Sequence, residues 1–239
     1  VDPTVYANAG SDFEVCIDSG TISLSGLPSS GVWSGGGISP QGDYTTSVVD
    51  TIDFVFTYGS GNCLTRDTME LVINPLPVVD AGLDFAVCVD DTIQVLIGNP
   101  LGGSWSGTGI TNASGDFNPT LAGVGTHTLT YYYLDSNGCD QTDTRDITVN
   151  GLPYVDAGLD TNICDQLIGV GYVGNPLGGY WTGAGMDSSG LFMPFSVGTF
   201  DVYYHYTDVN GCYNEDTLGI TVDPTVYANA GSDFEVCID

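Results

Sequence analysis

The chain has 239 residues, of which 30 are acidic and 2 are basic, and its formal net charge at pH 7 is −28. Nucleic-acid phosphates and anionic membrane surfaces are bound by clustered Lys and Arg, so this charge excludes both as partners. Apolar residues make up 42% and aromatic residues 11%, which indicates a folded protein rather than a disordered acidic tail. No run of 18 apolar residues and no secretory leader is present, so we expect no membrane insertion within this fragment.

Repeats organise the sequence. Residues 222–239 are identical to residues 1–18, so the sequence repeats at an offset of 221. Within that period Cys16, Cys88, Cys164 and Cys237 follow one another at intervals of 72, 76 and 73, which indicates a smaller unit of about 74 residues. We predict module 1 at 1–76, module 2 at 77–152, module 3 at 153–223, and the first strand region of the next repeat at 224–239.

The chain alternates between β-branched or aromatic runs and turn sequences. Strands are predicted, in chain order, at 52–58, 126–134, 143–149, 199–207 and 216–222. Asn-Gly turns at 135–139 and 208–212 predict hairpins, because both residues tolerate a positive φ. Glycine clusters such as 35–37 and 102–103 mark further turns, and no stretch has a helical period. The pattern predicts an all-β module: a small antiparallel β-sandwich of about seven short strands.

The cysteines predict a disulfide framework. Cys237 duplicates Cys16 and is expected to pair in the next repeat, which leaves six cysteines in equivalent positions. Their spacings of 47, 51 and 48 in the numbering predict one bridge within each module, namely Cys16–Cys63, Cys88–Cys139 and Cys164–Cys212. Zinc is the alternative, but one cysteine pair per module without a nearby His offers too few ligands. Disulfides imply an oxidising, extracellular setting.

Several motifs recur together. They are Ala-Gly-x-Asp-x-x-x-Cys at 81–88 and 157–164, Gly-Gly-x-Trp-x-Gly-x-Gly at 102–109 and 178–185, and a Tyr-rich strand that ends in Asp-x-Asn-Gly-Cys. As a set they resemble the PKD-like or Ig-like repeats of giant bacterial surface adhesins used in gliding motility or prey capture. The resemblance implies tandem small Ig-like (PKD-like) modules in a very large secreted filament. Module 1 departs from it, since Gly31-Val32-Trp33 replaces Gly-Gly-x-Trp and its hairpin turn lacks the Asp.

Catalytic machinery is not expected. When the modules are aligned on their second cysteine, His127 and His205 fall at different positions, so they do not form a repeated site. No Ser, His and Asp constellation recurs either, and we expect no enzyme and no catalytic residues. Trp33, Trp105 and Trp181 share the module spacing and are predicted to be core residues packed on the disulfides.

Aspartates at the module junctions are candidate calcium ligands, because calcium prefers hard oxygen donors. Asp80 and Asp84 precede module 2's first cysteine, and Asp156 with Asp160 repeats that spacing in module 3. The hairpin residues Asp135 and Asp208 are candidates to complete these sites. The alternative is that the same side chains make turn hydrogen bonds and keep the surface hydrated.

The expected function is structural. We expect the repeat region of a long cell-surface filament or adhesin that bears tension, assembles with itself, and contacts a target cell through regions outside this fragment. An alternative is an array of carbohydrate- or protein-binding modules in which Tyr131–Tyr133 forms a ligand platform. A third hypothesis is an accessory region beside a catalytic domain elsewhere in the polypeptide.

Overall fold

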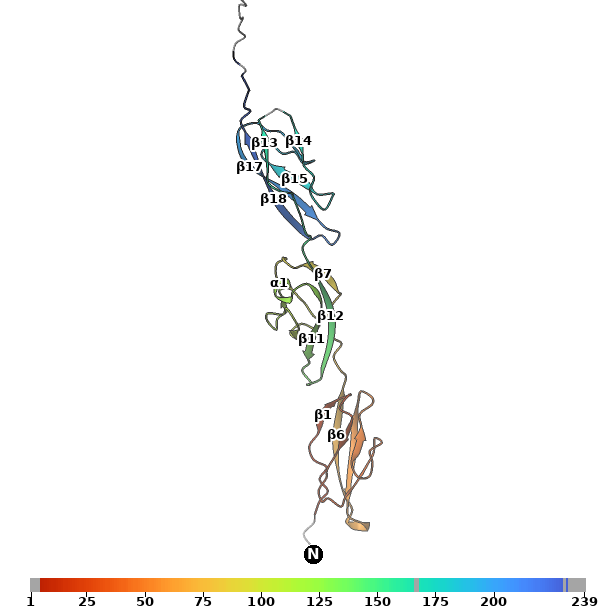
Figure 1. Ribbon diagram of the computed structural model, residues 1–239. Coiled ribbons are helices and arrows are strands. Elements are labelled where there is room, and N and C mark those ends of the chain that lie inside the picture. The colour runs from red at the N-terminus through yellow and green to blue at the C-terminus, as the bar shows by residue number, and fades with distance from the viewer. Residues whose placement is uncertain (1–4, 166–167, 230, 232–239) are drawn as a thin grey trace, which may run out of the picture. The chain divides into compact units, whose positions relative to one another are not determined.

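The computed structural model describes residues 5–165, 168–229 and 231 (Figure 1). Its contacts divide the chain into two compact units, each built from separate segments. Unit 1 consists of Val1–Phe85, Ile93–Ala122 and Thr126–Ile147, and unit 2 of Ala86–Thr92, Gly123–Gly125 and Thr148–Asp239. Among the described residues, no helix has the length and apolar character that crossing a membrane requires. The sequence repeats divide the same chain into three modules, at 1–76, 77–152 and 153–223.

Module 1 contains six strands and a short 3-10 helix, η1. They are β1 (Phe13–Cys16), β2 (Thr21–Ser23), β3 (Val32–Ser34), β4 (Asp43–Thr45), β5 (Asp50–Tyr58), η1 (Gly61–Cys63) and β6 (Thr65–Asn74). A four-stranded sheet has the order β1-β6-β5-β3, and β2 pairs with β4 in a second sheet. The longest pairing is the antiparallel hairpin β5–β6, whose first strand contains the predicted run 52–58, whereas its second strand was not predicted.

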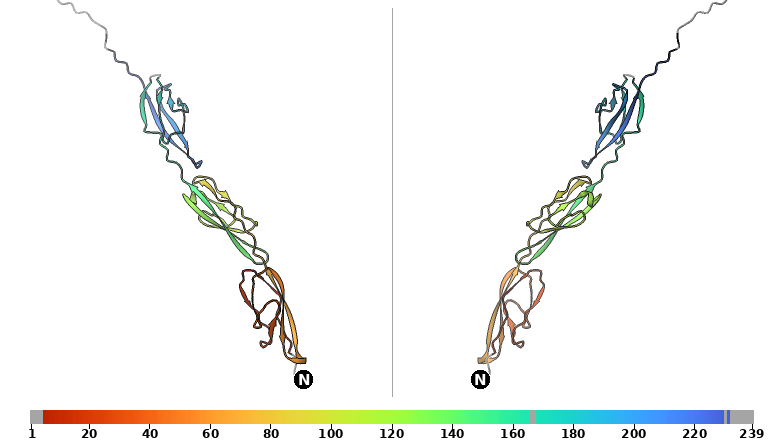
Figure 2. Two further views of the ribbon diagram at one scale, coloured as in Figure 1. Left: turned by 90° about the vertical axis from the view of Figure 1, so that its right-hand side faces the viewer. Right: turned by 90° about the vertical axis from the view of Figure 1, so that its left-hand side faces the viewer.

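Modules 2 and 3 repeat this plan. Module 2 has β7 (Phe85–Cys88), β8 (Gln94–Val95), β9 (Ser104–Ser106), β10 (Asp116–Phe117), α1 (Pro119–Ala122), β11 (Gly125–Leu134) and β12 (Asp140–Asn150). Module 3 has β13 (Thr161–Cys164), β14 (Val170–Gly171), β15 (Tyr180–Gly183), β16 (Leu191–Phe192), β17 (Gly198–Thr207) and β18 (Tyr213–Asp223). Their large sheets have the orders β7-β12-β11-β9 and β13-β18-β17-β15. The predicted all-β, Ig-like sandwich fold is confirmed, and the long paired strands are visible in Figure 2.

The first strand of the large sheet in modules 1 and 3 differs from the antiparallel prediction. β1 pairs with β6 in parallel, with Phe13 opposite Leu71 and Cys16 opposite Asn74. β13 pairs with β18 in the same sense, with Cys164 opposite Asp223. A chain that enters a module at one end and leaves at the other must run in one direction in its first and last strands. The parallel pairing therefore follows from the tandem arrangement.

Apolar side chains on the inward faces of these strands build each core. In module 1, Phe54, Leu71 and Ile73 are at most 1% exposed, and Trp33 packs against Phe56 with ring centroids 5.0 Å apart. Trp105 packs on Tyr131 and Trp181 on Tyr204 at the same 5.0 Å separation. All three tryptophans are buried, and each packs on an aromatic side chain of the first long hairpin strand of its module.

A buried tyrosine ties the Gly-Gly-x-Trp turn to the core in modules 2 and 3. The hydroxyl of Tyr131 donates to the carbonyl of Pro100 and accepts the amide hydrogen of Gly103. Tyr204 makes the same two bonds with Pro176 and Gly179. Module 1 has Phe56 at this position, and Ser30-Gly31 in place of the paired glycines. Phenylalanine has no hydroxyl, so the side chain of Phe56 cannot make these two hydrogen bonds in module 1.

We expect Tyr131→Phe to lower the free energy of unfolding by about 1–3 kcal/mol, because it leaves a backbone amide and a carbonyl without their partner. Urea denaturation of the oxidised chain measures this. Tyr132→Phe is the matched control, since it removes a hydroxyl from the neighbouring side chain, which is 38% exposed. Equal effects of the two substitutions would contradict the assigned role of the Tyr131 hydroxyl.

Candidate functional site

Two disulfides join successive modules. Cys16 at the end of β1 is bonded to Cys139 after the β11 strand, with a Cα–Cα distance of 5.6 Å. Cys88 at the end of β7 is bonded to Cys212 after β17, at 5.5 Å. The bonded residues are 123 and 124 positions apart in the sequence, and each pair lies within one compact unit. The first cysteine of a module is therefore bonded to the second cysteine of the module that follows.

This pairing corrects the sequence prediction: the bonds Cys16–Cys63, Cys88–Cys139 and Cys164–Cys212 are wrong. The parallel first strand gives the reason. Cys16 lies opposite Asn74, the last residue of β6, whereas Cys63 precedes Thr65, the first residue of that strand. Ten strand residues at about 3.3 Å each separate the two ends by roughly 30 Å, far beyond the roughly 7 Å that a disulfide can bridge between Cα atoms.

The hairpin turn presents the second cysteine. Asp135 accepts hydrogen bonds from the backbone amides of Asn137 and Cys139 at 2.9 and 2.8 Å, and its own amide donates to the Cys139 carbonyl. Asp208 does the same for Asn210 and Cys212. Cys139 and Cys212 are 0% exposed. The carboxylate thus stabilises the turn that holds the buried cysteine. These two aspartates therefore make turn hydrogen bonds, which was the alternative to their role as calcium ligands.

The first cysteine is held by its strand and by the turn that follows. The amide of Cys88 donates to a carboxylate oxygen of Asp91 at 2.8 Å. Cys88, Asp90 and Asp91 also form the one group of potential metal ligands found among the described residues. The Cys88 sulfur is committed to a disulfide, so it does not act as a thiolate ligand. We assign this group to the structure of the turn.

Among the cysteines that the structure describes, two are free. Cys63 lies in η1, in the module 1 turn that lacks the aspartate, and Cys164 is the last residue of β13. Both are exposed. The pairing predicted for Cys237 lies outside the described residues.

The six candidate calcium ligands do not come together as one ligand set. Among the described residues none of them belongs to a group of close metal-ligating side chains. Each instead accepts at least one backbone amide hydrogen: Asp80 from Gly82, Asp84 from Asp146, Asp135 from Asn137 and Cys139, Asp156 from Gly158, Asp160 from Gly219, and Asp208 from Asn210 and Cys212. The geometry matches turn and strand capping, and we derive no calcium site from it.

A further aspartate in each module was missed by the sequence analysis. Asp143 on β12 accepts the amide hydrogen of Ala81 at 2.8 Å, and Ala81 is 0% exposed. Asp67 holds Ala9 and Asp216 holds Ala157 in the same way. Each of these carboxylates lies four residues after the second cysteine of its module, and this constant spacing is the signal that was available.

Together these hydrogen bonds hold the linker, which is the segment that precedes the first strand of a module, against the last strand of that module. Asp84 of the linker accepts an amide hydrogen of β12, and Asp143 of β12 accepts one from the linker. Between them Gly82 turns the chain at φ 82°, a conformation that favours glycine. The Ala-Gly-x-Asp motif is therefore a clamp that orients the first strand, and with it the first cysteine.

Arg145 reinforces the clamp of module 2. Its guanidinium donates to the Leu83 carbonyl and lies over the Phe85 ring, 4.7 Å from the centroid. Burial lowers the pKa of Arg145, while the carboxylates of Asp84 and Asp80 oppose that change. One of the two cations of the chain is thus placed beside the junction aspartates.

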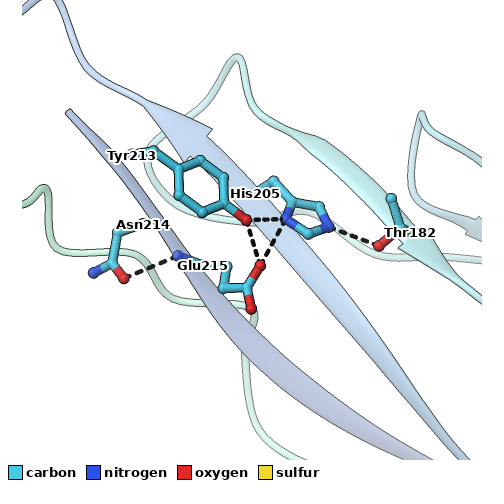
Figure 3. A network of polar contacts seen from close by, with 5 residues as sticks. All are labelled: Thr182, His205, Tyr213, Asn214 and Glu215. Carbon is cyan, nitrogen blue, oxygen red and sulfur yellow. Dashed lines mark hydrogen bonds and ion pairs between the residues drawn. The ribbon is translucent and has the colours of Figure 1, made fainter. Parts of the chain in front are cut away.

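His205 belongs to a local strand network (Figure 3). Its ring contacts Thr182 at 2.6 Å on one nitrogen and the Tyr213 hydroxyl at 2.6 Å on the other, and Glu215 lies 3.0 Å from that second nitrogen. The hydrogen bond from Tyr213 to Glu215 raises the pKa of the tyrosine to about 12. The four groups bridge three neighbouring strands, β15, β17 and β18. We assign the network to cross-strand packing.

Comparison with known proteins finds similarity at the level of structure. No family model and no curated protein matches the chain. Similar solved structures include Sidekick-1 immunoglobulin domains 1–5, with 14% identity over 91% of this chain and a TM-score of 0.31. This chain spans 58% of that Sidekick-1 chain. Identities this low say nothing of what the chain binds.

Two further similar structures are a Ca2+-stabilized adhesin that helps an Antarctic bacterium reach out and bind ice, and titin domains I67–I69. The adhesin is 16% identical over 95% of this chain and 76% of its own, with a TM-score of 0.39. The titin domains are 11% identical over 89% of this chain and 96% of their own, also at 0.39.

Trypsin tests the disulfide pairing directly, because the two basic residues, Arg66 and Arg145, divide the chain into three fragments. After thiols are blocked and the chain is unfolded in urea without reductant, we expect the three fragments to remain joined. The Cys16–Cys139 bond links the first fragment to the second, and Cys88–Cys212 links the second to the third. Mass spectrometry before and after reduction is the measurement. Release of three separate fragments without reductant would support the within-module pairing instead.

We expect Asp143→Ala to lower the free energy of unfolding by about 1–3 kcal/mol, since it leaves the buried Ala81 amide without an acceptor. Thermal and urea denaturation measure this. Asp140→Ala removes an exposed carboxylate from the same strand and serves as the control for the change in net charge. An effect of Asp143→Ala no larger than the control would show that the clamp contributes little.

Proposed function

We propose that this chain is part of the load-bearing repeat region of an extracellular filament or adhesin. The observation that carries the proposal is that each disulfide joins the first strand of one module to the hairpin of the next. A bond within a module would secure only that module. A bond between modules secures the junction, which is the point that tension along a tandem array loads in every repeat.

The bonds also limit how far the chain lengthens. Tension that enters β1 crosses from Cys16 to Cys139 through the disulfide, so the 123 residues of that interval do not have to carry it. If module 1 or module 2 unfolds, those residues stay slack. At about 3.4 Å per extended residue the bond withholds roughly 420 Å of length.

Chemistry and charge support an extracellular location. Disulfides persist in oxidising compartments, and a chain that relies on them at its junctions is suited to a cell surface. A net charge of −28 makes neighbouring chains repel one another and opposes nonspecific clumping. The division into modules at 1–76, 77–152 and 153–223, self-assembly into a filament, and attachment to a target cell are parts of this proposal.

The structure gives less support to the alternative function, an array of carbohydrate- or protein-binding modules with a tyrosine platform. Tyr131, the first residue of the proposed aromatic platform, is 2% exposed, and its hydroxyl is used inside the module. The three consecutive tyrosines Tyr131–Tyr133 of β11 therefore do not form one continuous exposed face.

Single-molecule force spectroscopy tests the load-bearing role. We use the double substitution Cys88→Ser and Cys212→Ser, which leaves Cys16–Cys139 as the one cross-module bond, with terminal handles that do not use thiols. Reduction should lengthen the fully unfolded chain by roughly 420 Å, because 123 residues are released. The matched control, Cys16→Ser with Cys139→Ser in the same background, should show no change on reduction. Equal extension of the oxidised and reduced double-substituted chain would overturn the proposal.

A further inference from the structure

Cys63 and Cys164 occupy the positions that are bonded elsewhere in the chain. Cys164 is the last residue of β13, as Cys16 is of β1 and Cys88 is of β7. Cys63 precedes β6 by two residues, whereas Cys139 and Cys212 directly precede β12 and β18. One free cysteine is thus a first cysteine without the second cysteine of a following module. The other is a second cysteine without the first cysteine of a preceding module.

The repeat supplies the missing partners. Residues 222–239 repeat residues 1–18, so the sequence after module 3 begins again as module 1. In an array in which the repeat continues, the second cysteine of that following module is the Cys63 of the next copy. Its separation from Cys164 would be 120 in the numbering, which is the repeat offset of 221 less the 101 that separate Cys63 from Cys164. The two observed bonds have sequence separations of 123 and 124.

The linker between periods also has the right length. Eleven residues lead from Asn74, the end of β6, to Phe85, the start of β7, and eleven lead from Asn150 to Thr161. In the sequence eleven residues lead from Asp223, the end of β18, to Phe234, which is Phe13 of the next copy. The junction between copies therefore matches the two junctions that carry disulfides.

We propose that Cys164 forms a disulfide with Cys63 of the next copy of the repeat. The exposure of these residues agrees with this, since Cys139 and Cys212 are 0% exposed in their bonds whereas Cys63 and Cys164 are exposed. The partner is a further copy of this sequence in the same polypeptide. Every junction of the array then carries one bond of the same kind.

The bond forms by thiol–disulfide exchange with a small-molecule or protein disulfide as oxidant. The Cys164 thiolate attacks that disulfide, which gives a mixed disulfide and releases one thiol. The thiolate of Cys63 from the next copy then displaces the second thiol and completes the S–S bond. Two cysteine thiols are oxidised, two protons are lost, and the oxidant takes up two electrons as a pair of thiols.

The mechanical effect of this bond deepens the proposed function and rests on it. The existence of the bond does not depend on that function. The second cysteine of one module precedes the first cysteine of the next by the same spacing of 25 at every junction: Cys63 to Cys88, Cys139 to Cys164, and Cys212 to Cys237. In a fully bonded array, a continuous covalent path can therefore be traced that uses only these short segments and the disulfides. Each step of one short segment and one disulfide moves the path forward by two modules. Between Cys139 and Cys164 the segment includes all of β12 and β13, which are already extended. Unfolding a module adds little length to such a chain.

The test uses a chain with two copies of residues 1–221 in tandem, oxidised with glutathione disulfide and then alkylated in urea, and mass spectrometry counts a cysteine that carries glutathione together with the alkylated ones. We expect two alkylated cysteines, Cys63 of the first copy and Cys164 of the second. Four alkylated cysteines would show that the junction between copies is unbonded and would overturn the proposal. No alkylated cysteine would show that Cys63 and Cys164 pair in another way, and would overturn it too.

One substitution placed in either copy provides matched controls. Cys63→Ser in the second copy removes the partner of Cys164 and should raise the count to three. The same substitution in the first copy removes a free thiol and should lower it to one. The force measurement above depends on Cys16–Cys139 alone, so the two proposals can fail separately.

Discussion

The parallel pairing of the first and last strands is the constraint on which the other features depend. It sets Cys16 beside Asn74, at the end where the chain leaves module 1, and leaves Cys63 at the opposite end of β6. Because a strand of ten residues separates them, neither cysteine can reach the other. Each of these cysteines can therefore form a disulfide only with a cysteine of a neighbouring module. The mechanical role proposed for the chain follows from that single choice of strand direction.

Carboxylates fix the geometry that makes those junction bonds possible. Asp84 and Asp143 clamp the linker to the last strand, and Asp135 shapes the turn that carries Cys139. In each case an ionised oxygen accepts hydrogen bonds from backbone amides, which is a stronger bond than a neutral acceptor makes. Part of the high acidic content of the chain thus has a structural use, and it repeats with the modules.

Much of the candidate site could be predicted from the sequence, but the cysteine pairing could not. The period, the hairpins, the buried tryptophans and the equivalence of the cysteines all follow from local pattern and spacing. The pairing did not, because the spacings of 47, 51 and 48 suit a bridge only if the first strand ends near the hairpin turn. That holds for an antiparallel first strand, whereas β1 and β13 are parallel to their neighbours.

The sequence by itself indicated equivalent β-rich repeats of about 74 residues, with two cysteines and one tryptophan in each. Alternating hydrophobicity and turn residues act over a few positions, so they can be recognised without a fold. Only the tertiary structure decided which cysteines meet and what the aspartates hold. Those contacts join residues with sequence separations of 62 for Ala81 with Asp143 and 124 for Cys88 with Cys212. Their partners are set by strand direction and register, which local sequence does not encode.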